Sequence, residues 1–271
     1  MGSIVSNTAL CGAAMGAPAM PATTAGAPWL SVITVCRNAG PLLRGTLASL
    51  RAQQLEAALE WVVVDGASTD GSADWLRRQQ PQRFVSEPDA GIYDAMNKAA
   101  ALATGEWLFF LNAGDAFADA GVLADVARAA AANPAVDIVF GDVLYVGAGG
   151  SRRKRFHWVT RRRLLFGDLC HQAVFVRRAL LQRNGPFYAS LRWNADFDWF
   201  VRACRAGARL HYLQRDIARF DDGGAHVQAG ACCEAERNTV RARYLPLPLW
   251  RLGNLALRVE LRLRRIAGQI V

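Results

Sequence analysis

The sequence predicts an α/β fold in which a mostly parallel, Rossmann-like central sheet carries helices on both faces. Short, apolar, β-branched runs alternate with helical segments from Trp29 onward. Strands that are separated by helices need crossover connections, and such connections produce parallel sheets with covered faces. The chain has 271 residues, of which 52% are hydrophobic, so it is long enough for one large domain with a sizeable core.

The first half of the chain shows this alternation most clearly. Its apolar runs have the length and composition of strands that are buried on both faces. The strands are expected at residues 30–36, 61–65, 84–86, 107–111 and 137–141. The helices between them are expected at residues 41–54, 72–80, 92–103 and 122–132. The last of these helices should end at the dipeptide Asn133-Pro134, because proline cannot continue it.

The alternation weakens after Val146. The expected elements of the second half are a loop at 147–150, a strand at 172–176, a helix at about 197–206 and a strand at 209–213. No internal repeat or linker composition divides the sequence, so residues 28–226 are interpreted as a single domain.

The two ends of the chain differ from this domain in composition. Residues 1–27 are rich in Ala, Gly, Met, Thr and Pro, and no positive charge precedes an apolar run there. We therefore expect a disordered N-terminal extension rather than a signal peptide. No window reaches the roughly 18 uninterrupted apolar residues of a spanning helix, so no transmembrane segment is predicted.

Residues 227–271 are expected to form a C-terminal helical segment that ends in a basic amphipathic helix. One face carries polar side chains at helical spacing, namely Arg251, Asn254, Arg258, Arg262, Arg265 and Gln269. The opposite face carries Leu252, Leu255, Val259, Leu263, Ile266 and Ile270. Such a helix can lie on an anionic membrane surface, or it can dock on the domain or on a second subunit. The sequence leaves these alternatives open.

The net charge of +9 favours an anionic partner. Nucleic acid is not expected as that partner, because no aromatic residues interleave the basic clusters and no nucleic-acid-binding module is present. No two of the six cysteines have the C-x-x-C spacing of a zinc or redox site. Cys36 and Cys204 lie in segments that are expected to be buried, which favours a reduced, cytoplasmic protein.

Polar residues follow the expected strands at the edge where ligands bind in an open parallel sheet. These residues are Arg37, Asn38, Asp65, Asp89, Gly91, Asn112, Asp115 and Asp142. So many carboxylates at one edge would repel each other, and a divalent cation removes that conflict. Mg²⁺ or Mn²⁺ fits best, because these ions bind through one or two carboxylates and substrate phosphates. Taken alone, Asp65 would be interpreted as an N-cap or turn residue, and the alternative for Asp115 is likewise a turn residue. Their shared edge and the glycine-rich turns beside them favour a binding role for both.

Other nucleotide enzymes are disfavoured, because the sequence has no G-x-x-x-x-G-K-[ST] loop and no G-x-G-x-x-G after the first strand. In the second half, Asp196 begins a helix, where it would serve either as a general base or as a capping residue. His226 lies in a glycine-rich loop as a candidate metal ligand. The neighbours Cys170 and His171 are not expected to act as a catalytic pair, because adjacent residues of a strand point in opposite directions.

Several motifs in order resemble family 2 glycosyltransferases, which have the GT-A fold. The motifs are SVITV (31–35), VVDGASTDG (63–71), SEPDAGIYDAMNK (86–98), GE (105–106) and FLNAGD (110–115). The GIYDAMNK block, together with HQAVF (171–175), is most similar to bacterial transferases of the colanic acid biosynthesis type, which build exopolysaccharide or O-antigen units. The resemblance covers the chain from about Trp29 to His226.

The resemblance implies a role for each candidate residue. It implies a nucleotide-sugar site formed by Thr34, Arg37, Asn38, Asp65, Asp89, Gly91 and Asn112. It further implies a metal site at Asp115 and His226, and a catalytic base at Asp196. Most relatives have acidic residues where this chain has Asn112 and Gly114, and many have one at Ala195, so the metal motif is reduced to Asp115 and the base to Asp196.

The implied reaction is an inverting hexosyl transfer from a nucleotide-diphosphate sugar to a hydroxyl of a saccharide acceptor. A lipid carrier would present that acceptor during synthesis of a bacterial surface polysaccharide, and the enzyme would then work at the inner face of the membrane. The alternative is a catalytically impaired nucleotide-sugar-binding or scaffold subunit, which the reduced metal motif at Asn112 to Asp115 would fit.

Overall fold

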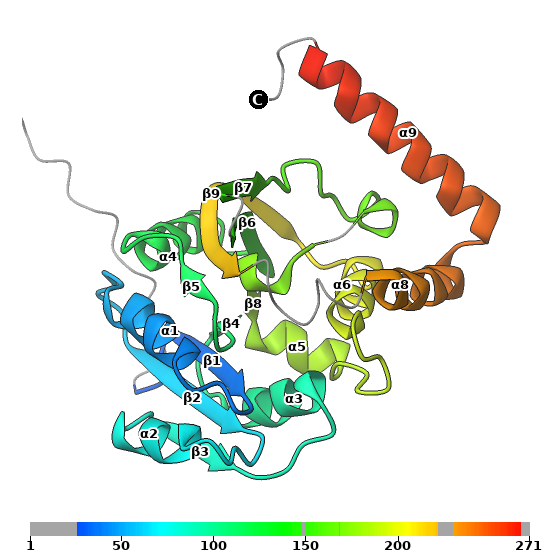
Figure 1. Cartoon of the computed structure of the whole chain (residues 1–271). Coiled ribbons are helices and arrows are strands. Elements are labelled where there is room, and N and C mark those ends of the chain that lie inside the picture. Colours follow the sequence, from blue (N-terminus) through cyan, green and yellow to red (C-terminus); the bar gives the residue numbers. More distant parts are fainter. Residues whose placement is uncertain (1–25, 148–149, 168, 222–229, 267–271) are drawn as a thin grey trace, which may run out of the picture.

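A computed structural model describes residues 26–147, 150–167, 169–221 and 230–266 of the chain. Within these residues, nine strands form one sheet with the order β3-β2-β1-β4-β8-β6-β9-β5, and β7 pairs with β6 (Figure 1). The strands are β1 (Leu30–Cys36), β2 (Leu59–Asp65), β3 (Arg83–Ser86), β4 (Trp107–Phe110), β5 (Ala116–Phe117), β6 (Ile138–Gly147), β7 (Gly150–Lys154), β8 (Val174–Arg177) and β9 (Leu210–Asp221).

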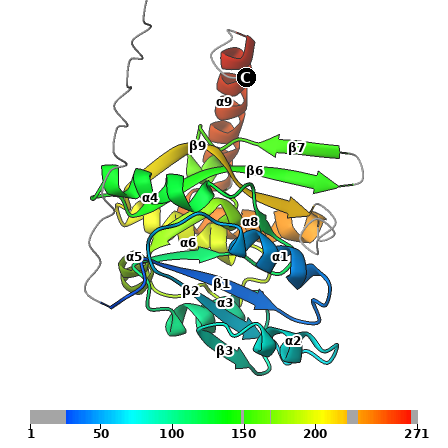
Figure 2. The same ribbon diagram turned by 90° about the vertical axis from the view of Figure 1, so that its left-hand side faces the viewer.

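Helices cover both faces of this sheet. The helices in the described part of the chain are α1 (Leu42–Arg51), α2 (Ser72–Arg78), α3 (Ile92–Leu102), α4 (Val122–Ala132), α5 (Arg178–Asn184), α6 (Ala195–Arg205), α8 (Gly230–Tyr244) and α9 (Leu247–Ile266), and α9 extends away from the sheet (Figure 1). Helices α1 and α4 lie on one side, and α3, α5 and α6 lie on the other (Figures 1 and 2). Helix α3 packs on β1 and β2, and α5 packs on β8.

The parallel part of the sheet is the part that the sequence predicted best. Strands β3, β2, β1 and β4 are mutually parallel, and β6 is parallel to β9. Strand β8 is antiparallel to both of its neighbours, β4 and β6. Because of that reversal, the start of β8 lies at the same edge of the sheet as the end of β4.

The second half contains more strand than expected. Strand β6 continues to Gly147 and forms a hairpin with β7, so Asp142 lies inside a strand and not at its end. The side chain of Arg152 lies over the ring of Tyr145, and Arg153 pairs with Asp216 at 2.6 Å. These partners stabilise a basic strand that has no apolar alternation of its own, which is why the hydrophobic pattern did not predict it.

The core fills both faces of the sheet. The ring of Phe109 stacks between Phe117 and Phe175, with centroid distances of 5.0 and 4.2 Å. Such offset stacks add to the stabilisation that burial alone provides. Gly105 allows the chain to pass close to Ser31, since a Cβ atom there would lie 2.5 Å from the Ser31 nitrogen.

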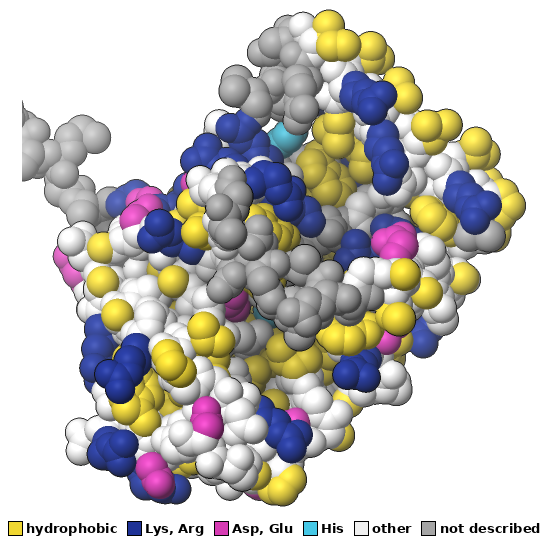
Figure 3. Space-filling view, viewed as in Figure 1, with side chains coloured by type: hydrophobic (Ala, Val, Ile, Leu, Met, Phe, Trp, Pro, Cys, Tyr) yellow, Lys and Arg dark blue, Asp and Glu magenta, His cyan; other side chains and the backbone are white. Residues whose placement is uncertain are grey.

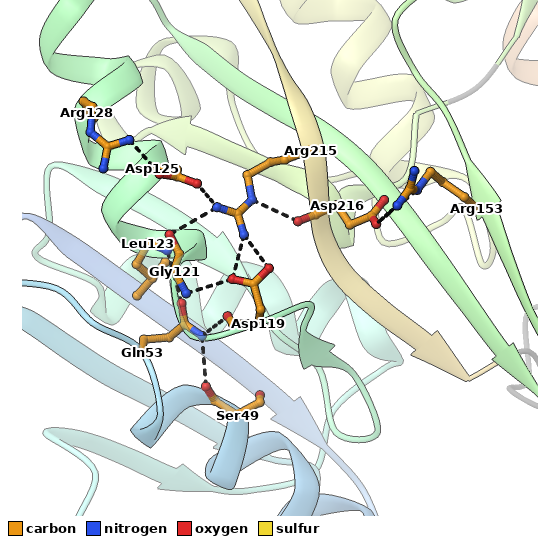
Figure 4. Close-up of polar contacts among 10 residues, drawn as sticks. All are labelled: Ser49, Gln53, Asp119, Gly121, Leu123, Asp125, Arg128, Arg153, Arg215 and Asp216. Atoms are coloured by element: carbon orange, nitrogen blue, oxygen red, sulfur yellow. Dashed lines mark hydrogen bonds and ion pairs between the residues drawn. The ribbon is translucent and has the colours of Figure 1, made fainter. Parts of the chain in front are cut away.

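The half-buried guanidinium of Arg215 joins the two halves of the chain. Arg215 of β9 donates hydrogen bonds to both carboxylate oxygens of Asp119 at 2.7 Å, and it pairs with Asp125 of α4 (Figure 4). Gln53, just beyond α1, donates to the Asp119 carbonyl at 2.7 Å and accepts from the Leu123 nitrogen at 3.1 Å. The first and second halves are therefore linked by charged contacts as well as by the sheet. None of the described helices is both long and apolar enough to cross a bilayer.

Candidate active site

The carboxyl ends of β1, β2 and β3 lie side by side, as expected for the edge of the sheet where the polar residues follow the strands. Cys36 lies beside Asp65, and Asp65 lies beside Ser86. The backbone then turns away from the sheet at each position, with the Gly66 nitrogen bonded to the Cys36 carbonyl and the Glu87 nitrogen bonded to the Asp65 carbonyl. Polar groups from three strands therefore converge on one rim.

Asp65 is completely buried in this rim. Its carboxylate accepts hydrogen bonds from the Ser68 nitrogen at 2.9 Å, the Ser68 hydroxyl, the Ser86 hydroxyl at 2.7 Å and the Cys36 thiol at 3.5 Å. A carboxylate has about four acceptor positions, so Asp65 is saturated by the turn. Contact with a base or a ribose would require it to exchange one of these bonds.

The residues around the end of β1 differ in exposure. Thr34 is fully buried, and its hydroxyl accepts a hydrogen bond from the Trp61 indole at 3.0 Å. Thr34 is therefore not proposed to contact the nucleotide sugar. Asn38 has a φ of 50° and holds the turn at Ser68 and Thr69 through bonds of 2.7 and 2.8 Å. Arg37 is exposed.

Asp89 packs against the same turn from the loop after β3. A Cβ atom at Gly66 would lie 2.2 Å from an Asp89 carboxylate oxygen, so only glycine fits beneath this side chain. The other oxygen of Asp89 accepts a hydrogen bond from the Gly91 nitrogen at 2.9 Å. Gly91 itself is exposed at the start of α3, with a φ of 129°. Asp89 and Gly91 therefore border the rim that Arg37 leaves open.

The turn after β4 is held from α1. The Thr46 hydroxyl accepts from the Gly114 nitrogen at 3.0 Å and donates to the Asp115 carbonyl at 2.8 Å. Gly114 has a φ of 97°, a conformation that favours glycine. Asn112 and Asp115 are both buried, and the Asn112 Oδ1 atom has no hydrogen-bond partner among the described residues.

The side chains at this turn could hold a divalent cation only together with the diphosphate of a bound nucleotide sugar, which would supply further ligands. In the described parts of the chain, no three His, Cys, Asp or Glu side chains form a preformed metal cluster. Asp115 is the carboxylate that this turn contributes. Mg²⁺ and Mn²⁺ often bind through one or two carboxylates, with substrate phosphates and water as the remaining ligands. His226 lies outside the described residues.

Asp196 lies in the first turn of α6 with three hydrogen-bond donors around its carboxylate. The Tyr93 hydroxyl and the Phe197 nitrogen both donate to Oδ1 at 2.8 Å, and His171 Nδ1 lies 2.9 Å from Oδ2. Burial would raise the pKa of Asp196, but the hydrogen bonds from His171 and Tyr93 outweigh it and hold the pKa below its usual value. The side chain stays 14% exposed. Asp196 is thus an ionised carboxylate that solvent can still reach.

His171 connects this carboxylate to the turn after β4. With Asp196 ionised, Nδ1 carries the proton, and Nε2 is left to accept a hydrogen bond from the Asn112 amide nitrogen at 3.1 Å. The direction of donation therefore runs from Asn112 through His171 to Asp196. Because the Asn112 amide nitrogen is used in this way, its unpartnered oxygen is presented as an acceptor.

Sequence reasoning missed His171 as a site residue. It correctly separated His171 from Cys170, whose thiol points to Gln172 at 2.6 Å and whose pKa burial raises to about 12. The contact with Asn112 spans 59 residues and arises because β8 starts where β4 ends. No spacing in the sequence reports such a contact.

Helix α8 supports the segment that leads into α6 and carries Asp196. The Glu236 carboxylate accepts hydrogen bonds from the backbone nitrogens of Arg192, Trp193 and Asn194, at 2.7 to 2.8 Å. These nitrogens lie immediately before α6, whose own first residues have no side-chain cap. A helix from the predicted C-terminal segment therefore fixes the segment that carries Asp196.

Comparison with known proteins places this arrangement in a family. The sequence profile described as glycosyl transferase family 2 matches residues 31–189, which include every strand end described above. The chain is a family 2 glycosyltransferase. The predicted family and the predicted GT-A-type α/β fold are thereby confirmed.

Curated relatives and solved structures agree with this family. The chain is 36% identical over 208 residues to a PGL/p-HBAD biosynthesis glycosyltransferase of Mycobacterium tuberculosis, covering 73% of this chain and 78% of that one. It matches S. aureus TarS 1–349 in complex with UDP-GlcNAc with a TM-score of 0.63 at 19% identity, over 80% of this chain and 67% of that one. The chain spans 42% of the longer TarS structure.

A second solved structure is equally similar in fold. The mannosyltransferase PcManGT from Pyrobaculum calidifontis, in complex with GDP-Man and Mn²⁺, matches with a TM-score of 0.63 at 22% identity. The match covers 86% of this chain and 69% of that one. At such identities the likeness shows the fold alone, and the nucleotide sugar bound to each neighbour is a property of that neighbour.

Proposed function

We propose that the chain is an inverting hexosyltransferase that moves a sugar from a nucleotide-diphosphate sugar to a hydroxyl of a saccharide acceptor. The observation that supports this proposal is the state of Asp196, an ionised carboxylate with 14% of its side chain exposed and three donors that fix its direction. A general base must be ionised and reachable by the proton that it takes.

The pattern of hydrogen bonds singles out one atom of the base. Oδ1 of Asp196 already accepts from two donors, whereas Oδ2 accepts only from His171 among the described residues. Since each carboxylate oxygen has about two acceptor positions, the free one is on Oδ2. We propose that this atom takes the proton of the acceptor hydroxyl. The hydroxyl oxygen attacks the anomeric carbon, and the bond from that carbon to the nucleotide diphosphate breaks as the diphosphate leaves.

The donor side of the reaction is proposed for the opposite rim. Arg37, Asn38, Asp89 and Gly91 border the nucleotide, and the free oxygen of Asn112 accepts a hydrogen bond from the donor. The UDP-GlcNAc and GDP-Man complexes of the two neighbours support a nucleotide-sugar donor. A divalent ion held by Asp115 and the diphosphate would neutralise charge on the leaving group.

We further propose that the acceptor is a saccharide on a lipid carrier and that the product is part of a bacterial surface polysaccharide. The enzyme would then work from the cytoplasm at the inner face of the membrane. The support comes from the resemblance to exopolysaccharide transferases and from the basic, amphipathic α9, whose mean hydropathy is close to neutral while its apolar side chains gather on one face.

Replacing the base tests the proposed reaction. Asp196→Asn keeps the shape of the side chain but removes its charge, so kcat should fall by roughly 10²–10⁴-fold. Donor binding, measured by calorimetry with UDP-GlcNAc and GDP-mannose, should not change, because Asp196 lies on the acceptor side. Asp74→Asn, which alters an exposed carboxylate on α2, is the matched control and should behave as the wild type. Wild-type turnover by Asp196→Asn would show that the base is another residue.

The pH profile gives a second readout of the same assignment. Because the pKa of Asp196 is lowered, its basic form persists as the pH falls, and kcat/KM should decline only below the usual range of an aspartate. If kcat/KM declined near neutral pH while the affinity for the nucleotide sugar stayed constant, Asp196 would not be the base.

The alternative function, a catalytically impaired subunit, has its own test. A wild-type chain that binds a nucleotide sugar but transfers no sugar to any acceptor would favour that alternative.

A further inference from the structure

Helix α9 is seated on the domain through one side only. Trp250 and Leu257 are buried, and the Asn254 amide donates to the Phe166 carbonyl at 2.9 Å. At Gly253 a Cβ atom would lie 2.2 Å from the Phe166 ring, so the helix backbone rests directly on that ring. These contacts fix which side of α9 faces inward.

The outward side of α9 is apolar. Its five large side chains are 48 to 83% exposed, namely Leu252, Leu255, Val259, Leu263 and Ile266. They recur at intervals of three and four residues, so they form one continuous stripe, which we call the outer stripe. Figure 3 shows hydrophobic side chains along the outer edge of this helix. An unpaired stripe of this kind on a soluble domain usually marks an interaction surface.

A row of exposed arginines runs beside the outer stripe. Arg251, Arg258 and Arg262 are all exposed, and dark-blue side chains follow the helix next to its apolar edge in Figure 3. Glu260 is the one acidic residue in the sequence of α9, and it already pairs with Arg163 at 2.9 Å and with Arg264 at 2.8 Å. The helix thus presents apolar and positively charged groups together.

We propose that the outer stripe of α9 docks on the surface of an anionic lipid bilayer, with the helix lying parallel to the membrane plane. The stripe would enter the boundary between headgroups and acyl chains, and the arginine row would contact the phosphates. The charge pattern selects this occupant over a second copy of the chain. Two α9 helices packed face to face would bring arginine rows together without acidic groups to neutralise them.

Docking on lipid would also orient the active site, a consequence that rests on the proposed function. Helix α9 follows α8 after two residues, and Glu236 of α8 holds the segment that carries Asp196. A membrane-bound α9 would therefore hold the catalytic base at a set distance from lipid-linked acceptors. The docking itself does not depend on the identity of the acceptor.

Vesicle sedimentation with the full chain tests the docking. The wild type should pellet with vesicles of phosphatidylcholine and phosphatidylglycerol, bind at least about tenfold more weakly to phosphatidylcholine alone, and be released by salt. The double variant Leu255→Gln, Leu263→Gln should lose binding by at least about tenfold without a change in charge. Arg258→Gln with Arg262→Gln should lose the preference for the anionic lipid. Val146→Gln, at an exposed apolar position on β6, is the matched control and should bind normally.

Three outcomes would overturn the proposal. Equal binding to neutral and anionic vesicles would exclude the arginine row from the contact. A wild-type dimer in light scattering that the Leu255, Leu263 double variant converts to a monomer would assign the stripe to a second copy. Binding that appears only after deletion of residues 1–25 would assign the stripe to that segment. Thermal melting checks that each variant is folded, and Asp196→Asn should still bind vesicles, which separates failure of docking from failure of the proposed reaction.

Discussion

At the scale of single residues, the proposed chemistry depends on which donors reach the Asp196 carboxylate. Tyr93 contributes a hydroxyl from α3, and its own pKa is raised well above the usual value by burial and by the adjacent Asp196 charge, so it remains a donor. His171 contributes a ring nitrogen from the start of β8. These donors keep the base ionised and leave one acceptor position open.

Two replacements of His171 separate its two hydrogen bonds. In His171→Asn the amide nitrogen takes the place of Nδ1 and still donates to Asp196. In His171→Gln the amide oxygen takes the place of Nε2 and accepts from Asn112, which leaves Asp196 without that donor. Loss of a hydrogen bond to a charged group costs about 1.5–3 kcal/mol, so His171→Gln should lose roughly 10–100-fold in kcat. His171→Asn should lose much less.

Steady-state kinetics with the donor held at saturation measures this difference, and KM for the acceptor shows whether binding has changed as well. Equal losses in both variants would mean that the bond between Nδ1 and Asp196 is not what positions the base. Thermal melting checks that both variants are folded, and each should still unfold in one cooperative transition, since each keeps one polar contact.

At the scale of elements, the start of α6 is held by another helix. The dipole of α6 favours a negative charge in its first turn, where Asp196 and Asp198 lie. The chain before α6 is fixed by Glu236 of α8, which receives three backbone hydrogen bonds from it. The predicted boundary between residues 226 and 227 stays a prediction, but the segment after it contacts the stretch of chain that carries Asp196, the proposed base.

Removal of Glu236 should therefore affect both stability and catalysis. Glu236→Ala leaves three backbone nitrogens without their acceptor, and the bonds from Trp193 and Asn194 are part-buried, so the free energy of unfolding should fall by about 1–3 kcal/mol. It should also lower kcat, because the segment that carries Asp196 loosens, while donor affinity is unchanged.

Urea unfolding and steady-state kinetics measure the two effects. Thr239→Ala, at an exposed position of the same helix, is the control and should change stability by less than about 0.5 kcal/mol. If Glu236→Ala lost stability but kept its kcat, α8 would be a structural support without influence on the base.

At the scale of the whole molecule, the sheet brings together two halves with different tasks. The parallel strands β1, β2 and β3 end in the rim proposed for the nucleotide, and β8 with α6 carries the proposed acceptor side. The turn after β4 lies between them, because Asn112 contacts His171 while Thr46 of α1 holds Gly114. Donor, metal and base are thus expected to meet at this turn.

Titrations with nucleotide sugars, with and without Mn²⁺, test whether Asp115 helps to bind a metal ion at this turn. Because Asp115 needs the diphosphate to complete a metal site, Mn²⁺ should tighten the binding of UDP-GlcNAc or GDP-mannose, and EDTA should reverse the effect. Asp115→Asn should abolish the response to Mn²⁺ and leave the metal-free affinity nearly unchanged. Calorimetry measures each affinity. An unchanged affinity with and without Mn²⁺ in the wild-type protein would remove the proposed role of Asp115.

Sequence patterns predicted the first half of the fold closely. Helix α4 has the expected bounds, and β1 has them as well, because both are continuous apolar or amphipathic segments with clear ends. Patterns failed at β7, whose residues are Gly, Ser, Arg and Lys, since its partners Tyr145 and Asp216 lie on other strands. An edge strand that is stabilised by such long-range contacts has no local hydrophobic signature.

The sequence by itself determined the family, the parallel strands and the set of carboxylates from which Asp196 was selected, because all of these depend on local motifs and their order. Only the tertiary structure decided how each candidate is used. It buried Thr34 and saturated Asp65, it brought His171 to Asp196, and it left the apolar side of α9 exposed. These outcomes depend on which side chains meet across the reversal at β8 and across the contact with α8, and contacts between distant segments leave no pattern in the sequence.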